Sequence, residues 1–505
     1  MERRPAPIGG HPPSGDHSID SPEGVTRSAH TGWIQGAQAA LGYAQRAVRL
    51  PFPLAAEIAV ARAVGRLSRL VGTGGGTTVP GKLLWKLDPG AVDRLAARLP
   101  QGSALLSATN GKTTTAAMAA RILRVRVRLA HNSSGANLVS GVASTLLDAH
   151  RAELGLFEVD EAALPEVAAR VRPRALCLGN LFRDQLDRYG ELEHVAARWR
   201  AAVCELDPDA VLAVNGDDPQ VGELARERPG AVVFGVDDPS CARPALQHAA
   251  DSKYCVRCGT PYEYAAAYVG HLGDYRCPSC GHGRPPLAIA AREIELHGLE
   301  SVAFRLVTPH GARPVRLGLP GLYNVYNALA AAALAGSLGA SLDEVVSGLE
   351  GFRAAFGRFE RIMIADRGLL MLLIKNPAGA NEAVRTIVDG GAPSLAVVAL
   401  NDAIADGRDV SWIWDVDFEP LIGGLDRLIA TGDRAAELAL RFKYGGLPAD
   451  AIEVLPPLER ALDRGLALTP VGGELVVLPT YTAMLALRKI VGQRGFVRPY
   501  WERAA

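Results

Sequence analysis

Gly111, Lys112 and Thr113 have the residue types, in the order, that bind a nucleoside triphosphate. Backbone N–H groups at a helix N-terminus and a lysine ammonium suit the β- and γ-phosphates, and a threonine hydroxyl suits Mg²⁺. The complete phosphate-loop pattern would have glycine where Leu106 stands, so an ordinary helix cap is the alternative interpretation. The predicted ATP-binding residues of this loop are Thr109, Asn110, Gly111, Lys112, Thr113 and Thr114.

A short acidic segment, Glu158-Val-Asp-Glu161, is the next candidate. Transfer of a phosphoryl group to a carboxylate brings two anions together, and a cation held by hard oxygen ligands neutralises their charge. We predict a Mg²⁺ site made by Thr113 with Glu158 or Glu161, and we slightly favour Glu161. A solvated acidic turn is the alternative.

Four of the seven cysteines form two Cys-x-x-Cys pairs, which are separated by 18 residues. Two such pairs present four thiolates to Zn²⁺ in a tetrahedron, and a closed site of this kind leaves no position for a catalytic water. We therefore predict a structural zinc ribbon over residues 251–285. Its zinc ligands are Cys255, Cys258, Cys277 and Cys280.

Short apolar runs that alternate with helical segments must position these groups. The run at 105–107 is followed by the glycine-containing loop and a helical stretch at 113–124. Alternation of this kind predicts an α/β fold with a parallel sheet covered by helices. The other runs expected to be strands of this sheet are 155–159, 175–178 and 210–214, and a second series is 369–374, 395–400, 427–430 and 475–478.

The domain organisation follows from these patterns. Residues 1–32 are rich in Pro, Gly, Ser and His and cannot bury enough surface to fold, so we expect a disordered tail. The remaining predicted parts are an N-terminal helical segment at 33–98, a central ATP-binding domain at 99–361 with the ribbon inserted, and a Rossmann-like C-terminal α/β domain at 362–505.

Charge and composition exclude several classes of protein. Lys plus Arg equals Asp plus Glu at 54 each, so no net field draws the chain to nucleic acid. Apolar runs stay well short of a membrane span, and the N-terminus lacks the apolar core of a signal peptide. We expect a cytoplasmic protein, with peripheral association at the inner membrane face left open.

The loop Thr109-Asn-Gly-Lys-Thr-Thr114 resembles that of the Mur ligase family, with Ala108 where glycine is usual. The stretch 180–190 resembles a family segment and has Gln185 where most members carry a metal-binding histidine. Segments 321–327 and 357–360 resemble further family elements. The resemblance implies that Glu158 or Glu161 and Gln185 bind Mg²⁺. It also implies that Asn324, Asn327 and Arg358 contact the nucleotide.

Within that family, the chain resembles the MurT group over about residues 50 to 495. Lys375-Asn-Pro377 replaces the usual Asp-Tyr-Ala-His-Asn-Pro segment, and residues 401–415 match a MurT stretch. The resemblance implies amidation of the D-glutamate α-carboxylate in the lipid II stem peptide through an acyl phosphate. A GatD-type glutaminase subunit, in a heterodimer or larger complex, would deliver ammonia. No nucleic-acid partner is expected.

The resemblance also implies that an aspartate of this chain completes the partner's Cys-His pair by orienting its histidine. Asp402, Asp406 and Asp409 are the candidates. We favour Asp402 because it directly follows the predicted strand at 395–400, where open α/β sheets usually carry functional groups. Loop or cap roles remain the alternative for each.

Two other functions compete with this hypothesis. A stand-alone amino-acid-adding or polyglutamate-type ligase would work without a glutaminase, and the missing Tyr and His of the third-domain segment argue against it. A zinc-ribbon scaffold or nucleic-acid-binding regulator would bind ATP without turnover and would need a basic surface, which the balanced charge does not indicate.

Overall fold

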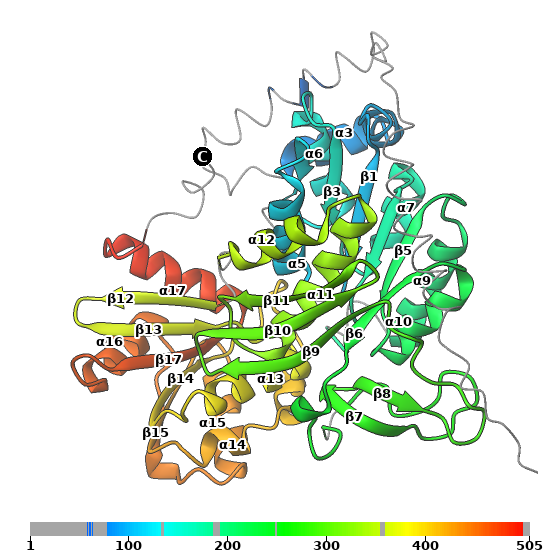
Figure 1. Ribbon diagram of the computed structural model, residues 1–505. Coiled ribbons are helices and arrows are strands. Elements are labelled where there is room, and N and C mark those ends of the chain that lie inside the picture. The colour runs from blue at the N-terminus through cyan, green and yellow to red at the C-terminus, as the bar shows by residue number, and fades with distance from the viewer. Residues whose placement is uncertain are drawn as a thin grey trace, which may run out of the picture.

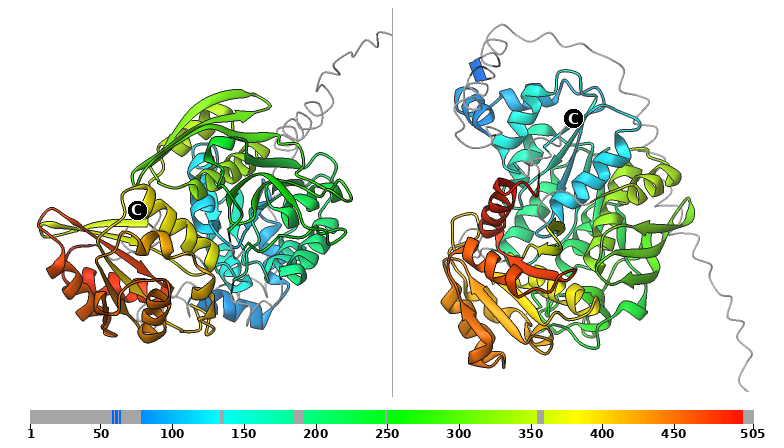
Figure 2. Two further views of the ribbon diagram at one scale, coloured as in Figure 1. Left: turned by 90° about the horizontal axis from the view of Figure 1, so that it is seen from below. Right: turned by 90° about the vertical axis from the view of Figure 1, so that its left-hand side faces the viewer.

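The computed structural model describes residues 78–132, 136–184, 192–247, 250–353 and 359–497, together with residues 58, 60, 61 and 63. The predicted tail, most of the N-terminal helical segment, Gln185 and Arg358 lie outside this part of the chain. Two open α/β sheets lie side by side, and a small hairpin packs below the larger one (Figure 1). Figure 2 shows the two sheets and their covering helices from two other sides.

The larger sheet has nine strands in the order β11-β10-β9-β6-β5-β4-β1-β3-β2. Strands β1 to β6 are all parallel, and β9 pairs in parallel with β6. Strands β10 and β11 extend the sheet as antiparallel strands. The strands are β1 (Ser103–Ser107), β2 (Leu129–His131), β3 (Leu154–Glu158), β4 (Ala175–Leu178), β5 (Val211–Asn215), β6 (Val232–Val236), β9 (Ile289–His297), β10 (Ser301–Thr308) and β11 (Gly311–Leu317).

Helices cover both faces of this sheet, so every residue of β1, β3 and β4 is buried. One face packs against α5 (Lys112–Leu123), α11 (Leu322–Ser337) and α12 (Leu342–Glu350). The alanine run of α11 favours a helix and lets it approach α5 closely. The other face packs against α3 (Val79–Leu87), α4 (Ala91–Ala96), α6 (Val139–Asp148), α7 (Leu164–Val171) and α9 (Leu192–Cys204).

The smaller sheet has six strands in the order β12-β13-β17-β14-β15-β16, and β12 alone pairs antiparallel. Its strands are β12 (Phe359–Ile364), β13 (Arg367–Leu372), β14 (Leu395–Ala399), β15 (Arg427–Thr431), β16 (Ile452–Val454) and β17 (Glu474–Pro479). Its main helices are α13 (Pro377–Asp389), α14 (Glu419–Ile422), α15 (Ala435–Tyr444), α16 (Leu458–Leu468) and α17 (Tyr481–Gln493). The predicted α/β class and both series of strands are therefore confirmed.

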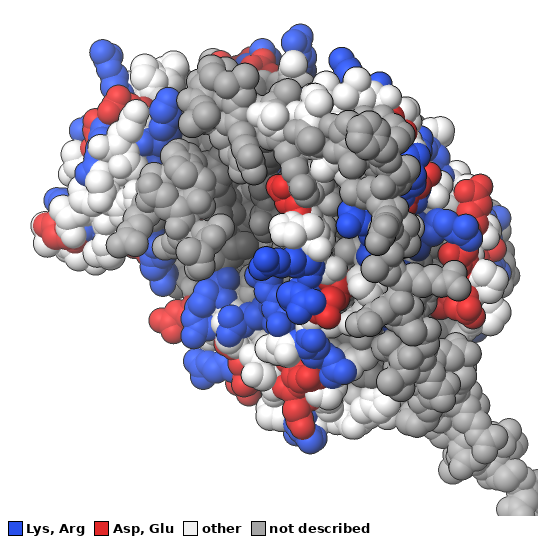
Figure 3. Space-filling view, turned by 90° about the horizontal axis from the view of Figure 1, so that it is seen from above, with Lys and Arg blue, Asp and Glu red and all other residues white. Residues whose placement is uncertain are grey.

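The four paired cysteines flank a separate antiparallel hairpin, β7 (Glu263–Val269) and β8 (Leu272–Arg276). Short helices α10 (Pro219–Glu223) and η1 (Leu224–Glu227) lie beside it. Among the described residues, no helix is long and apolar enough to span a membrane. Basic side chains gather on the face seen in Figure 3 and have acidic side chains close to them, which fits the balanced charge.

Candidate active site

The phosphate loop joins β1 to α5, and its shape depends on Gly111. This residue is the N-cap of α5 and has φ of +86°, which favours glycine. A Cβ atom at this position would lie 1.9 Å from Oδ1 of Asn327, so a side chain has no room. The loop therefore lies directly against Asn327 of α11.

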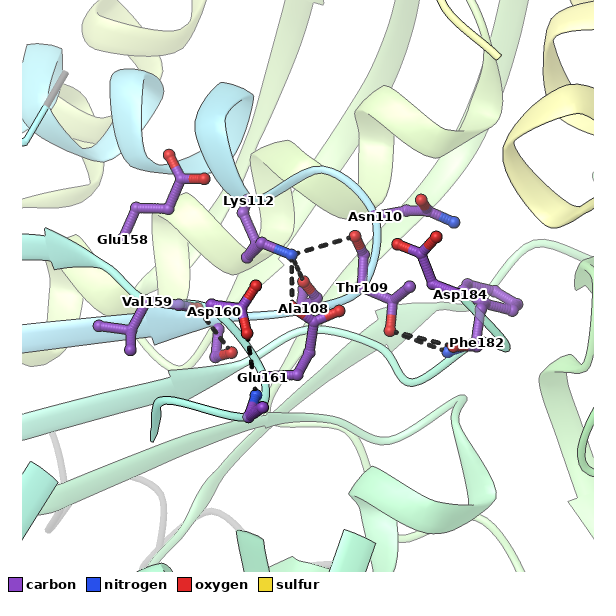
Figure 4. Close-up of polar contacts among 12 residues, drawn as sticks. Ala108, Thr109, Asn110, Lys112, Glu158, Val159, Asp160, Glu161, Phe182 and Asp184 are labelled. Carbon is purple, nitrogen blue, oxygen red and sulfur yellow. Dashed lines mark hydrogen bonds and ion pairs between the residues drawn. The ribbon is translucent and has the colours of Figure 1, made fainter. Parts of the chain in front are cut away.

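Lys112 is buried at the start of α5, and its ammonium group forms polar contacts with neighbouring residues (Figure 4). Nζ lies 2.7 Å from Oε2 of Glu161, and it donates to the carbonyl oxygens of Ala108 at 2.5 Å and Thr109 at 3.2 Å. Burial lowers the pKa of Lys112, but the Glu161 carboxylate outweighs this effect, so the pKa is raised overall. Lysine and glutamate are both ionised at neutral pH.

Thr113 and Glu158 form a second polar pair beside the first. The Thr113 hydroxyl donates to Oε1 of Glu158 at 2.9 Å. Glu158 is the last residue of β3, and Asn132 fixes its backbone by bonding to its N–H and its carbonyl oxygen at 2.9 and 2.8 Å. The Thr113 hydroxyl and the Glu158 carboxylate therefore meet at the phosphate loop, and such hard oxygens suit Mg²⁺.

The segment after β4 closes one side of the loop. Oδ1 of Asn180 accepts from the backbone N–H of Asn110 at 2.9 Å, and the Thr109 hydroxyl accepts from the N–H of Phe182 at 3.1 Å. Asp184 is buried and forms an ion pair with Lys375. Burial raises the pKa of Asp184, although Lys375 opposes this effect.

Asn324 and Asn327, which were predicted to contact the nucleotide, lie on α11 beside the loop. Oδ1 of Asn327 accepts from the Thr115 hydroxyl at 3.2 Å, and its Nδ2 donates to Oδ1 of Asn324 at 3.0 Å. Both asparagines line a cleft together with Asn110, Gly111 and Thr114. Phe359, Leu372 and Lys375 line it from the smaller sheet, so the cleft lies between the two sheets.

Lys375 and Asn376, for which the sequence predicted no role, also lie at this site. Asn376 exchanges hydrogen bonds of 3.2 and 3.0 Å with the side chain of Asn110, and it also caps α13 by accepting from the N–H of Gly379 at 2.9 Å. Lys375 reaches into the cleft beside it. The Asn-Pro pair at a helix start was the available signal for the cap.

Comparison with known proteins identifies this arrangement. The Mur ligase middle domain model matches residues 107–276, and the MurT ligase C-terminal model matches residues 373–484. A MurT subunit of the glutamine-hydrolysing lipid II isoglutaminyl synthase from Streptococcus pneumoniae is 34% identical over 438 residues, covering 86% of this chain and 95% of that protein. The chain belongs to the MurT family.

Other relatives agree with this assignment. The MurT subunit from Staphylococcus aureus strain N315 is 30% identical and covers 85% of this chain and 95% of its own length. A pseudomurein peptide ligase type C from Methanothermus fervidus has the same fold, with a TM-score of 0.63, 21% identity and coverage of 78% of both chains. The MurT-family chain is therefore a ligase of the lipid II isoglutaminyl synthase type, with a role in peptidoglycan synthesis.

The four paired cysteines of this MurT-family chain converge in space. Their Sγ atoms all lie within 4.8 Å of one another, and the pairs Cys255–Cys280 and Cys258–Cys277 are 3.6 and 3.4 Å apart. Thiolates bound to one Zn²⁺ at about 2.3 Å would be about 3.8 Å apart. Backbone N–H groups also donate to the sulfurs of Cys255 and Cys277 at 3.5 Å. The cluster fits a tetrahedral zinc ion.

The three candidate aspartates have different surroundings. Asp406 is buried and accepts from the N–H of Thr482 at 2.8 Å and from its hydroxyl, so it caps α17. Burial raises its pKa, and these hydrogen bonds oppose the effect. Asp409 accepts from the N–H of Ser411 at 2.8 Å, and interactions with the Ser411 hydroxyl and with this N–H lower its pKa. Asp402 is partly exposed, and its carboxylate lies 3.5 Å from the Arg434 guanidinium.

Proposed function

We propose that this chain catalyses ATP- and glutamine-dependent amidation of the D-glutamate α-carboxylate in the lipid II stem peptide, giving D-isoglutamine. The observations that support this best are the pairs Lys112–Glu161 and Thr113–Glu158 at the phosphate loop, whose residues Asn110 and Gly111 line the cleft. The family membership narrows the reaction class, because its curated members are named as lipid II isoglutaminyl synthase subunits.

The chemistry explains why a phosphate site is needed. A carboxylate is a poor electrophile, so we propose that ATP converts it to an acyl phosphate that ammonia then attacks. Lys112 would leave Glu161 and bind the phosphates. The phosphates would then take the place of the Glu161 carboxylate as the anion beside the buried ammonium. The N-terminus of α5 adds backbone donors to the same charge.

Bound Mg²⁺ would neutralise the charge that builds up between the γ-phosphate and the substrate carboxylate. We propose that Thr113, Glu158 and Glu161 hold it, and that Gln185 contributes a further oxygen. Asn324, Asn327 and Arg358 are the proposed contacts to the rest of the nucleotide. These side chains are suitable ligands for Mg²⁺, because each proposed metal ligand offers a hard oxygen atom.

We propose that the four cysteines hold a structural zinc ion. It would join the two turns that flank β7 and β8, because one pair of ligands precedes β7 and the other follows β8. The ribbon then docks on the nucleotide-binding domain through Glu223 of α10, which lies 2.9 Å from Nε2 of His282 and 2.7 Å from the Arg257 guanidinium.

We propose that ammonia comes from a separate GatD-type class I glutaminase. Cys177 is buried in the core and burial raises its pKa, so it is unsuited to act as a nucleophile. Asp402 is the proposed triad member because it lies shortly after β14 and is partly exposed, whereas the carboxylates of Asp406 and Asp409 already accept backbone hydrogen bonds. Ile404, two residues further along, has 74% of its surface exposed and could contact such a partner.

The test is an amidation assay on lipid II with purified chain, a GatD-type glutaminase, ATP and glutamine, followed by mass spectrometry of the stem peptide. We expect amide formation that depends on ATP, and we expect ammonium salts to replace glutamine plus glutaminase. Addition of an amino acid by the chain alone, with no amidation, would support the stand-alone ligase and contradict the proposal.

A further inference from the structure

The hairpin between the cysteine pairs forms one wall of the nucleotide cleft. Its turn is Gly270-His271, and the flanking residues Val269 and Leu272 both line the cleft with Asn110 of the phosphate loop. Both apolar side chains are buried. The ribbon therefore contributes directly to the cavity that would hold the nucleotide, in addition to packing on the domain surface.

The hairpin tip is held by the nucleotide-binding domain on one side. The Phe182 ring lies 4.7 Å from the ring of His271, and Nε2 of His271 lies 3.3 Å from the buried carboxylate of Asp218. Oδ2 of Asp218 also accepts from the N–H of Leu181 at 2.8 Å. One carboxylate thus joins the hairpin tip to the segment that binds the phosphate loop.

The C-terminal domain holds the same tip from the other side. Arg385 of α13 donates to the carbonyl oxygen of Tyr268 at 3.1 Å. Arg243 also donates to this oxygen, at 3.3 Å, and forms an ion pair of 2.5 Å with Glu382 of α13. Because Asn376, which contacts Asn110, caps the N-terminus of α13, the tip and the phosphate loop both form hydrogen bonds with this helix or its cap.

The ribbon has little apolar core of its own. The buried cluster consists of Cys255, Tyr262, Tyr275 and Cys277, and Tyr264 packs against it. The cysteine-bearing end therefore depends on a metal or another crosslink, whereas Tyr268, Val269 and Leu272 at the other end belong to the main core of the domain. Strand β8 runs from Leu272 to Arg276 and is followed at once by Cys277, so one short strand connects the metal ligand to the cleft wall.

We infer that zinc in the ribbon sets the affinity of the cleft for nucleotide, because the metal fixes the hairpin whose tip is both a cleft wall and a contact to the C-terminal domain. This inference rests on the proposed function in one respect, namely that the cleft binds ATP. Removal of zinc releases Cys277 at the end of β8, so the position of Leu272 in the cleft wall then depends on the contacts of the tip alone.

The test measures binding of β,γ-methylene ATP with Mg²⁺ to the full chain by calorimetry, before and after zinc is removed with a chelator that leaves Mg²⁺ bound. Zinc content is measured in the same samples. We expect a stoichiometric zinc ion, a Kd at least about 10-fold weaker after its removal, and recovery on adding zinc back. An unchanged Kd in chain proven free of zinc would overturn the inference.

Two variants test the role of the cleft wall without removing the metal. They remain informative if zinc removal unfolds the chain. Leu272→Ala and Arg385→Ala should keep one zinc ion per chain and the native circular dichroism, and should weaken analogue binding about 10-fold. Arg313→Ala, an exposed arginine on β11, is the matched control and should bind as the native chain does. Native affinity in both test variants would overturn the inference.

Failure of the proposed function has a different signature. A zinc-loaded native chain that binds no analogue would contradict the ATP site itself, and the inference would fall with it. Normal binding that is indifferent to zinc and to Leu272 would leave the ATP site intact and contradict only the role of the ribbon.

Discussion

Nζ of Lys112 lies 2.7 Å from Oε2 of Glu161, and both side chains are buried. The pair joins the start of α5 to the end of the acidic segment after β3. Each charge neutralises the other in the absence of ligand, so the site can hold a lysine and a carboxylate away from water. When a triphosphate binds with its cation, the negative phosphates can replace Glu161 as the partner of Lys112. The cation can replace Lys112 as the partner of Glu161.

Lys112→Ala tests the phosphate role of this ammonium. Loss of the buried positive charge removes a donor aimed at the phosphates, so we expect kcat/KM for ATP to fall about 100-fold or more. The measurement is phosphate release in the amidation assay. Lys86→Ala, on an exposed face of α3, is the control and should have native activity. Native turnover by Lys112→Ala would contradict the proposed site.

Glu161→Gln tests the energetic cost of leaving Lys112 unpaired. Burial raises the pKa of Glu161, but Lys112 and Lys375 lower it more, so folding lowers the pKa overall. The carboxylate therefore stabilises the fold above its unfolded pKa of about 4.3, and this contribution is lost as the pH falls through the folded value.

At pH 7 we expect Glu161→Gln to lower the free energy of unfolding by about 3 to 5 kcal/mol, because a buried charge loses its partner. The difference between the native chain and the variant should shrink as the pH falls below about 4.3 and on through the lower folded pKa of Glu161, because the carboxylate is protonated first in the unfolded chain and last in the native chain. Urea unfolding across this pH range measures it. A difference that grows with acidification would contradict the direction of the pKa shift.

Gly111→Ala and Gly230→Ala form a matched pair. Their φ angles are +86° and +88°, so both variants incur a similar backbone cost of about 1 kcal/mol. An added Cβ at Gly230 meets nothing within 4 Å, whereas at Gly111 it meets Asn327 at 1.9 Å. We expect Gly230→Ala to bind nucleotide normally and Gly111→Ala to lose binding, as measured by calorimetry. Equal binding would show that the contact with Asn327 is dispensable.

Asp402→Asn tests the proposed contribution to the glutaminase. The side chain is partly exposed, so we expect a change in unfolding free energy within about 0.5 kcal/mol. Glutamine-driven amidation should be lost, while amidation with ammonium salts should be kept. Asp409→Asn should keep both activities, and loss of only the glutamine-driven activity in that variant would move the role to Asp409.

Asp406→Ala should act on stability instead. Its carboxylate is buried and accepts two hydrogen bonds from Thr482, so its removal should cost about 1 to 3 kcal/mol. Thermal unfolding measures this loss. Native stability together with loss of only the glutamine-driven activity would show that Asp406, and not Asp402, serves the partner.

The sequence by itself determined the local features of this protein. The Gly-Lys-Thr turn, the Asp-Glu segment after an apolar run, the two cysteine pairs and the alternation of strands and helices all depend on residues close together in the chain. Such features are set by backbone conformation and short spacing, so they could be predicted without a fold. The parallel strands at 175–178 and 395–399 lie where they were expected.

Tertiary structure alone decided which of these groups meet. Lys112 and Glu161 are 49 positions apart, Asp184 and Lys375 are 191 apart, and Asn110 and Asn376 are 266 apart. The same holds for the ribbon, whose hairpin tip forms a wall of the cleft only because α13 and the segment around Phe182 approach it from two domains. Contacts between residues so far apart in the sequence depend on how whole sheets and helices pack. That packing cannot be predicted from the spacing of neighbouring residues.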